Sequence, residues 1–282
     1  MAVVNKLRLE IFEKITLDRE NFQAQTHFQV HLKPKNFMRF LAFVFSVAAA
    51  SFLTGCASTY IPPSGRADFS TFTTVSMQEG FAAKPAAGFP AGIAAVRVQT
   101  SNYRSFNTER EGGVYGSGRY SVITVKDVED DADLERLQRL PNVGGLISIS
   151  PLLLPKNLQS EISLREAAAR LKADMLLLYT FDTTFHENDS SVTLSVISLG
   201  ILPMQKVSVH VTASALVIDT RTGFIYAALE ANEKRQLRSN AWESDESADR
   251  ARRDAEKAAF KSLVGEFEKN WPKIVERAHQ VS

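Results

Sequence analysis

A run of mostly apolar residues, 40–53, follows Arg39 and stops three positions before Cys56, the only cysteine of the chain. Fourteen helical residues span about 21 Å, which is less than the roughly 30 Å hydrocarbon core of a bilayer. This length argues against a lasting transmembrane helix and is typical of the apolar region of a cleaved export signal. A single cysteine also excludes an internal disulfide and a metal site built from several cysteines. The alternative is a core helix over 40–53, with Cys56 as a small buried hydrophobe.

The motif Leu53-Thr54-Gly55-Cys56 resembles the end of the signal peptide in bacterial lipoproteins. The resemblance implies that the Cys56 thiol receives a diacylglyceryl group, that the chain is cleaved between Gly55 and Cys56, and that the new amino terminus is acylated. Because Ala57 rather than Asp follows the cysteine, the resemblance further implies export to the outer membrane, with the body facing the periplasm. Two or three acyl chains on one residue anchor a protein far more durably than a single chain does.

The apolar run divides the chain into segments. Residues 1–37 are expected to be a leader or a mis-assigned upstream start, since Met38 directly precedes Arg39. Residues 38–55 then form the signal peptide. Residues 56–92 are rich in Ser, Thr, Ala, Gly and Pro, which predicts a flexible tether. In the alternative, this segment packs on the body as a strap through three aromatic side chains, Phe69, Phe72 and Phe81.

Residues 93–282 are numerous enough for one well-buried core and are predicted to form a single α/β domain. Ser163-Leu164-Arg165-Glu166 has the pattern of a capping box and predicts a helix over 163–173. The apolar stretch 175–181 predicts a strand buried on both faces. Strict alternation of apolar and polar residues, followed by a glycine-containing turn, predicts an antiparallel hairpin at 207–231.

An alanine-rich stripe predicts a long helix over 245–271, which Pro272 is expected to kink or end. Shorter patterns predict strands at 93–99, 120–128, 146–154 (an edge) and 192–202, and a helix through 134–140 capped by Asp131 or Asp133. The expected fold class is therefore an α/β (α+β) sandwich, in which the two main helices pack on a mixed sheet that includes the hairpin.

The helix 163–173, the strand 175–181 and the turn at 219–223 resemble the domain shared by the amino-terminal part of the translocation protein TolB, the curli-secretion lipoprotein and the lipoprotein activators of penicillin-binding proteins. The stretch Arg119–Tyr226 is also similar to the rhombotarget lipoproteins, a group without an established function. Some members of that group carry a Gly-Gly, apolar, basic tail. The present sequence reads Ala278-His279-Gln280-Val281-Ser282 instead, so sorting through such a tail is not expected.

The sequence offers little that points to catalysis. With 33 Lys and Arg against 32 Asp and Glu, net charge does not favour a polyanion, and no nucleic-acid partner is expected. Neither a Gly-x-Ser-x-Gly elbow nor a phosphate-binding loop occurs. The metal-ligand types Asp182, His186, Glu187 and Asp189 lack an i, i+4 histidine pair, and His210 falls on the polar face of a strand. We therefore expect no catalytic residue, no metal and no cofactor, and a solvated loop around 182–189.

Aromatic and arginine side chains gather among glycines in the segment 100–120. Such residues dominate interface hot spots, and a connection of this length is often functional or disordered. Six of them form the predicted partner-binding site, with plain disorder as the alternative: Tyr103, Arg104, Phe106, Tyr115, Arg119 and Tyr120.

The expected function is that of a non-enzymatic binding or assembly module. Lipid on Cys56 would hold it on the outer membrane and raise its effective concentration for an envelope protein, which it would bind through the segment 100–120 or a sheet edge. One alternative is an oligomeric secretion-pore lipoprotein, for which 192–202 and 207–217 would supply a hairpin. Another is an envelope hydrolase, which would need a cleft with convergent titratable groups.

Overall fold

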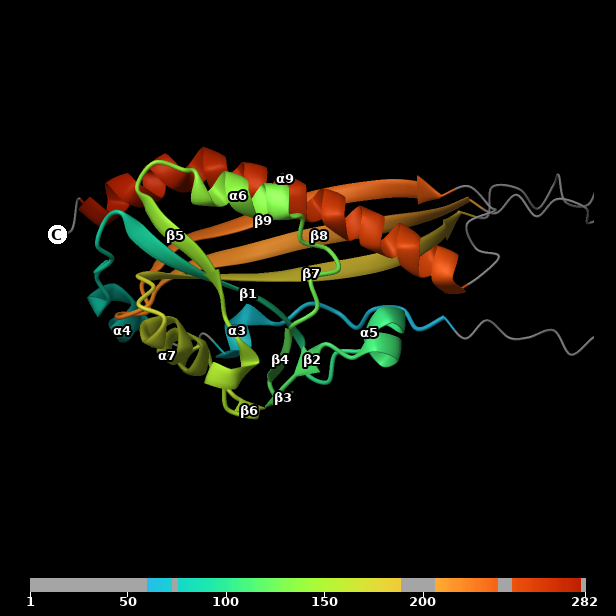
Figure 1. Cartoon of the computed structure of the whole chain (residues 1–282), viewed down its shortest axis with the longest axis horizontal. Helices are drawn as coiled ribbons and strands as arrows, with labels where there is room; N and C mark the ends of the chain where they lie inside the picture. Colours follow the sequence, from blue (N-terminus) through green and yellow to red (C-terminus); the bar gives the residue numbers. More distant parts are fainter. Residues whose placement is uncertain (1–59, 73–75, 189–205, 238–244, 280–282) are drawn as a thin grey trace, which may run out of the picture. The chain divides into compact units, whose positions relative to one another are not determined.

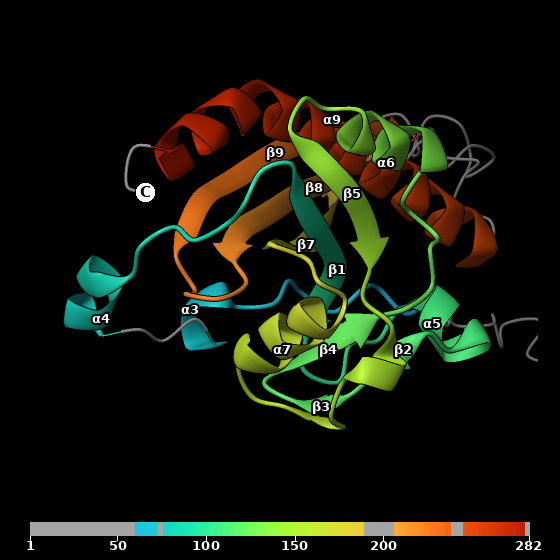
Figure 2. The same cartoon turned by 60° about the vertical axis from the view of Figure 1, so that its left-hand side comes forward.

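A mixed β-sheet runs through the body and has helices on both of its faces (Figures 1 and 2). The computed structural model describes residues 60–72, 76–188, 206–237 and 245–279. Its strands are β1 (Ala91–Thr100), β2 (Val114–Tyr115), β3 (Ser117–Gly118), β4 (Tyr120–Ile123), β5 (Val143–Ser148), β6 (Asn157–Leu158), β7 (Met175–Asn188), β8 (Lys206–Asp219) and β9 (Ile225–Leu237). Its helices are α3 (Phe69–Phe72), α4 (Met77–Ala82), α5 (Phe106–Glu111), α6 (Asp131–Gln138), α7 (Ile162–Arg170) and α9 (Asp245–His279), with a 3₁₀ turn at Pro151–Leu153.

Strand β1 lies at the centre of the sheet, whose order is β2-β4-β1-β7-β8-β9. One edge of β1 pairs in parallel with β7. Its other edge is shared, because β5 pairs in parallel with the first half of β1 and β4 pairs antiparallel with the second half. Strands β3 and β6 form a separate two-stranded sheet. The mixed sheet and its packed helices confirm the predicted α/β class.

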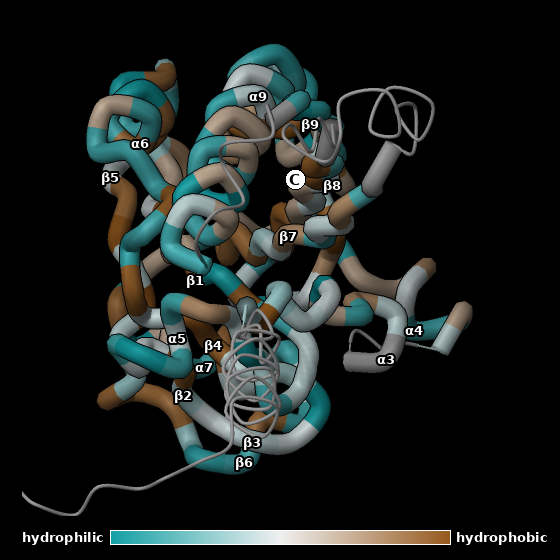
Figure 3. The backbone as a smooth tube through the Cα atoms, turned by 90° about the vertical axis from the view of Figure 1, so that its right-hand side faces the viewer, coloured by the Kyte–Doolittle hydropathy of each residue, from teal (hydrophilic) through white to brown (hydrophobic). Residues whose placement is uncertain are grey.

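The hairpin predicted at 207–231 is present as β8 and β9, paired antiparallel around the turn at 220–224. Alternate residues of β8 point to one face, where Val209, Val211, Ala213, Ala215 and Val217 join the larger hydrophobic core beneath α6 and α9. In Figure 3, brown hydrophobic stretches mark β5 and β7, whereas α9 carries many teal hydrophilic turns. The helix therefore turns many of its polar residues to solvent, whereas its buried face is mostly apolar and also carries Asp249, Arg252 and Glu256.

A second core lies on the opposite face, under α7. Leu164, Ala167 and Ala168 are fully buried there, as the predicted apolar stripe requires. The residues 175–181 are buried on both faces, as predicted, because the two cores enclose this part of β7. The capping box is wrong: α7 begins at Ile162, and the residue that precedes it, Glu161, makes no side-chain capping bond. The predicted cap residue Ser163 therefore lies inside the first turn.

Helix α9 continues beyond its predicted end. Pro272 lies inside it, and the helix extends to His279. A proline removes one helical hydrogen bond and crowds the preceding turn. The cost is offset because Trp271, Ile274 and Ala278 are all buried in the larger core.

The flexible tether predicted for 56–92 is wrong for the described part of that segment, which forms a strap along the body. The backbone N–H of Ala67 donates to Thr180 Oγ1 at 3.0 Å, and that of Ala86 donates to Asp219 Oδ2 at 2.7 Å. Of the aromatic side chains predicted to hold the strap, Phe69 packs against the core under α7, whereas Phe81 is 91% exposed. The side chain of Phe72 lies outside the described residues.

Several predicted bounds also change. Strand β4 stops at Ile123 instead of Val128, and the extended stretch predicted at 146–154 ends at Ser148, after which Pro151 opens a 3₁₀ turn. Helix α6 is capped by Asp130, whose side chain accepts from the backbone of Ala132. The solvated loop predicted around 182–189 is wrong for 182–188, which form the end of β7 and pair with β8. The strand predicted at 192–202 lies outside the described residues.

Candidate functional site

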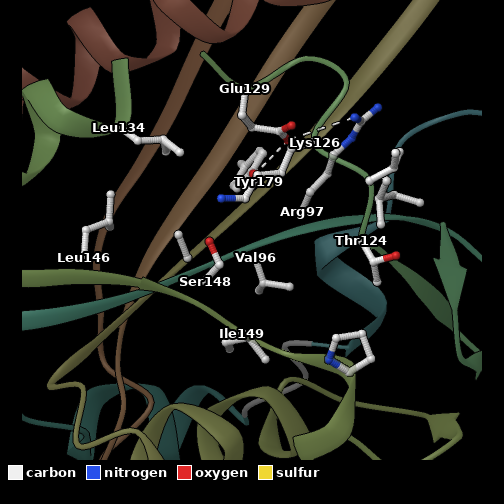
Figure 4. Close-up of a pocket in the computed structure, with 14 residues that line it drawn as sticks. Val96, Arg97, Thr124, Lys126, Glu129, Leu134, Leu146, Ser148, Ile149 and Tyr179 are labelled. Atoms are coloured by element: carbon white, nitrogen blue, oxygen red, sulfur yellow. Dashed lines mark hydrogen bonds and ion pairs between the residues drawn. The ribbon is translucent and has the colours of Figure 1, made fainter. Parts of the chain in front are cut away.

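The candidate site lies where two strands leave the same edge of β1. Strand β5 follows β1 as far as the pair Ser148 and Ala95, whereas β4 pairs with β1 from Arg97 onward. Because the two strands diverge around Val96, the edge is not closed there, and a cavity of about 90 Å³ remains (Figure 4).

Three polar side chains converge on one side of this cavity (Figure 4). Glu129 comes from the loop after β4, Arg97 from β1 and Tyr179 from β7. The Tyr179 hydroxyl donates to Glu129 Oε1 at 2.9 Å, and Arg97 Nη1 lies 4.0 Å from the same oxygen. Apolar side chains, including Leu146 and Ile149, line other parts of the cavity. The site is therefore polar on one side only.

The Arg97 guanidinium also belongs to a buried ion network that joins β1 to α9. Its Nη1 lies 2.9 Å from Asp127 Oδ1, and its Nη2 lies 3.4 Å from Glu256 Oε2. Arg252, on α9, contacts the same two carboxylates and also Asp249, at 2.9 Å. Buried charges need this degree of pairing, because removing them from water costs several kcal/mol per ion.

The charges around these groups set their protonation states. Burial by itself lowers the pKa of Arg97, but Glu129 and Glu256 outweigh it and hold that pKa above its ordinary value. Burial raises the pKa of Asp127, but Arg97 and Arg252 outweigh that effect and lower the pKa. Burial, aided by Glu129, raises the pKa of Tyr179 well above its usual value. At neutral pH, Tyr179 is therefore a hydrogen-bond donor and not a proton acceptor.

Two buried polar atoms beside the cavity, Arg97 Nε and Glu129 Oε2, have no hydrogen-bond partner among the described residues. They leave one donor and one acceptor for a bound molecule. At roughly 30 Å³ per molecule, the cavity has room for about three waters. Pockets for metabolites usually begin near 300 Å³, so the site suits waters or a very small polar molecule.

A larger hollow of about 390 Å³ lies between the strap and the strands β8 and β9. Residues 66–70 form one wall, and Ala228–Glu230 of β9, the last strand of the sheet, form another. Thr180 and Ser214 also line the hollow, and Ser214 Oγ is buried without a partner among the described residues. This hollow is large enough for a peptide side chain or a small ligand.

The structure distributes the six predicted binding residues over different surroundings. The segment 100–120, for which disorder was the alternative, folds into α5, β2, β3 and the start of β4. Tyr103 and Tyr120 are buried, and the Tyr120 hydroxyl donates to the carbonyl of Ser160 at 2.9 Å. The Tyr115 hydroxyl donates to the carbonyl of Leu154 at 2.8 Å. The three tyrosines therefore stabilise the fold.

The other three predicted residues are more accessible. Arg104 is exposed and pairs with Glu109 at 2.7 Å, and Arg119 is exposed on the turn between β3 and β4. Phe106 is half-buried, and its ring centroid lies 5.9 Å from that of Tyr60. Partner binding through this segment stays a prediction, and of the six predicted residues these three have the side chains most accessible to a partner.

Cys56 and the cleavage residues Leu53, Thr54 and Gly55 lie outside the described residues, as does Asp189. His186 and His210 lie side by side with ring centroids 4.6 Å apart, and slight burial together with Lys234 lowers the pKa of His210. In the described ranges, no three potential ligands of the His, Cys, Asp or Glu type come together as a metal site.

No protein-family model matches this chain, and no curated protein matches it significantly. Among the described helices, none combines the length and the apolar character needed to cross a membrane.

The ion network was not predicted, although the sequence carries two signals for it. Arg97 interrupts the otherwise apolar strand around Ile93–Gln99. Arg252 and Glu256 occur beside the alanines of the α9 stripe, so the helical period turns them toward the sheet. A charged residue on an otherwise apolar face indicates a buried ion pair. The sequence spacing does not indicate which residue of another element is its partner.

Proposed function

We propose that the protein is a lipid-anchored envelope protein, held on the periplasmic side of the outer membrane through Cys56, and that its body binds or helps to assemble another envelope protein. The proposal rests on the residues Leu53-Thr54-Gly55-Cys56 and on one structural observation. The body's first described residue, Tyr60, follows Cys56 by only four positions. Acylation at Cys56 would therefore attach lipid only four positions before Tyr60.

The anchor can be tested with single substitutions in a Gram-negative host. The wild-type protein should incorporate labelled palmitate and fractionate with the outer membrane, whereas Cys56→Ser should do neither. Ala57→Asp should keep the label but remain in the inner membrane, since the lipoprotein resemblance assigns sorting to this position. Labelled Cys56→Ser, or an unlabelled wild-type protein, would refute the anchor.

The sheet edge at β9 supports the binding role better than the segment 100–120 does. No described strand pairs with the outer edge of β9, and the 390 Å³ hollow has one wall on this strand. Exposed strand edges are templates for an added strand from a partner, and an adjacent hollow gives such a strand side-chain specificity.

The edge is tested by Ala228→Arg, which introduces a long charged side chain at the hollow. Leu152→Arg is the matched control, because Leu152 is 94% exposed and lies on the 3₁₀ turn away from β9. Proteins that copurify with the wild type from cross-linked envelopes should be lost with Ala228→Arg and kept with Leu152→Arg. If the same proteins copurify with both variants, partners bind elsewhere, and Arg104→Ala would then test the segment 100–120.

A further inference from the structure

The fold also bears on which end of the body faces the membrane. We infer that the end formed by α5 and by the far ends of β7, β8 and β9 rests on the lipid headgroups of the leaflet that holds Cys56. We call this the anchor end and define it by residues 106–111, 184–186, 208–210 and 234–236. The inference depends on the proposed lipid anchor and adds an orientation and an interaction surface to it.

The covalent chain sets the distance between the anchor and the body. Tyr60 follows Cys56 by four positions, and a chain extends at most about 3.3–3.6 Å per residue, so their Cα atoms lie within about 14 Å. A flexible tether of 37 residues would have let the body turn freely. The hydrogen-bonded strap removes that freedom, because the described part of 56–92 belongs to the body.

Contacts of the first described residues fix where this short link meets the body. The ring centroid of Tyr60 lies 5.9 Å from that of Phe106 on α5 and 5.7 Å from that of Phe185 near the end of β7. The carbonyl of Ile61 accepts from the backbone N–H of Phe106 at 3.0 Å. Tyr60 and Ile61, the first described residues, therefore lie between α5 and the end of β7, and α5 and that strand end lie on the same side of the body in Figure 1.

The opposite end of the body is far from this point. From Val209, which pairs with Phe185, to Asp219, β8 advances ten residues, or roughly 33 Å at about 3.3 Å per residue. The strap reaches Asp219 through Ala86, and α4, just before Ala86, lies at the end opposite α5 (Figure 1). A 14 Å link at Tyr60 cannot bring α4 to the headgroups while α5 points away.

The chemistry of the anchor end suits a lipid headgroup region. Its strand ends carry exposed His186, Lys234 and Arg235, and Arg110 lies over the ring of Phe106 with its guanidinium carbon 5.2 Å from the ring centroid. Basic groups at the surface of a body close to a bilayer attract anionic headgroups. Glu109 and Glu111 reduce the positive charge of this end. The inference therefore rests more on the short distance between Cys56 and Tyr60, and on the contacts of Tyr60, than on net charge.

The single cysteine makes the orientation measurable on the full protein purified from envelopes. Once Cys56 is acylated, an introduced cysteine is the only free thiol. Glu111→Cys and Arg235→Cys place one at the anchor end, and Met77→Cys and Phe81→Cys place one on α4, all at exposed positions. Each variant is labelled with a small fluorophore and reconstituted into phosphatidylethanolamine and phosphatidylglycerol vesicles that carry a nitroxide on the headgroup.

The inferred orientation requires loss of fluorescence at positions 111 and 235 and little or none at positions 77 and 81. Equal quenching at all four positions, or stronger quenching on α4, would overturn the orientation. The wild-type protein serves as the control for the anchor itself, because it should take up no fluorophore and should show an acylated Cys56 by mass spectrometry. A labelled, unacylated Cys56 would overturn the proposed function, whereas acylation with the wrong quenching pattern would overturn the orientation alone.

Discussion

Helix α9 packs on one sheet in two different ways along its length. Toward its carboxyl end it presents large apolar side chains to the larger core: Phe260, Leu263, Phe267, Trp271 and Ile274. Toward its amino end it presents buried Arg252 and Glu256 to β1 and to the loop after β4, and buried Asp249 pairs with Arg252 on the same helix. Both parts are excluded from water, but only the first gains free energy simply from that exclusion.

The two halves of α9 contribute differently to the stability of the fold. Burying an apolar side chain stabilises a fold by about 1.5–3 kcal/mol, largely irrespective of its neighbours' identity. A buried ion pair adds little net stability, yet removing one partner costs about 3–5 kcal/mol because the other charge is left without compensation. The apolar half therefore holds α9 down, and we expect the charged half to select its register on the sheet.

The largest loss of stability should come from the apolar half, with Trp271→Ala. Its indole is buried, stacks on Phe267 at 5.3 Å between centroids, and donates to the carbonyl of Pro141 at 2.7 Å. The cavity left by removing a buried indole costs about 3–5 kcal/mol of stability. Because the carbonyl of Pro141 also loses its hydrogen-bond donor, the expected loss lies near the upper value. Urea unfolding of the purified protein measures it, and a loss under about 2 kcal/mol would mean that α9 does not depend on this half.

The next largest loss is expected from Arg252→Met in the charged half. About 3 kcal/mol should be lost at pH 7, the lower end of the ~3–5 range, because Arg97 still compensates Asp127 and Glu256. The lowered pKa of Asp127 means that its stabilisation is present above the unfolded pKa near 3.9 and is lost as pH falls below it. The variant lacks part of this stabilisation, so its deficit should shrink in acid.

The matched comparison is Trp271→Ala over the same pH range. Its deficit arises from apolar packing and one neutral hydrogen bond, so it should stay nearly constant between pH 7 and pH 3. If the two deficits vary with pH in the same way, the contrast between the halves of α9 is not electrostatic.

The same contrast explains what could be predicted from the sequence. The stripe of α7, the buried strand at 175–181 and the hairpin at 207–231 follow from periodicity, since each apolar residue needs only some core and not a particular partner. The ion network needs named partners on three elements, Arg97, Asp127 and Arg252, and no local pattern specifies which of them meet. The strap was predicted only as the alternative to a flexible tether, and its partners could not be predicted for a related reason, because its bonds join Ala67 and Ala86 to residues more than 100 positions away.

A smaller effect is expected from Tyr179→Phe at the candidate cavity. The change removes the hydroxyl that donates to Glu129 and keeps the ring, which packs on Phe260 at 5.4 Å between centroids. Leaving a buried carboxylate oxygen with only Arg97 at 4.0 Å should cost about 1–3 kcal/mol. Denaturant unfolding gives the value, and a neutral result would indicate that water in the cavity satisfies Glu129.

The smallest effect should come from an exposed pair with the same residue types and spacing as a buried one. Glu135 on α6 and Arg139, which caps the carboxyl end of that helix, are an i, i+4 pair with side chains 58% and 75% exposed, whereas those of Arg252 and Glu256 are 1% and 0% exposed. Because water already solvates the exposed charges, Arg139→Ala should cost only about 0.3–0.5 kcal/mol and less at high salt. Denaturation in low and high salt distinguishes the pairs: a cost for Arg139→Ala as large as that of Arg252→Met would show that burial is not what makes the α9 network sensitive to the loss of one charge.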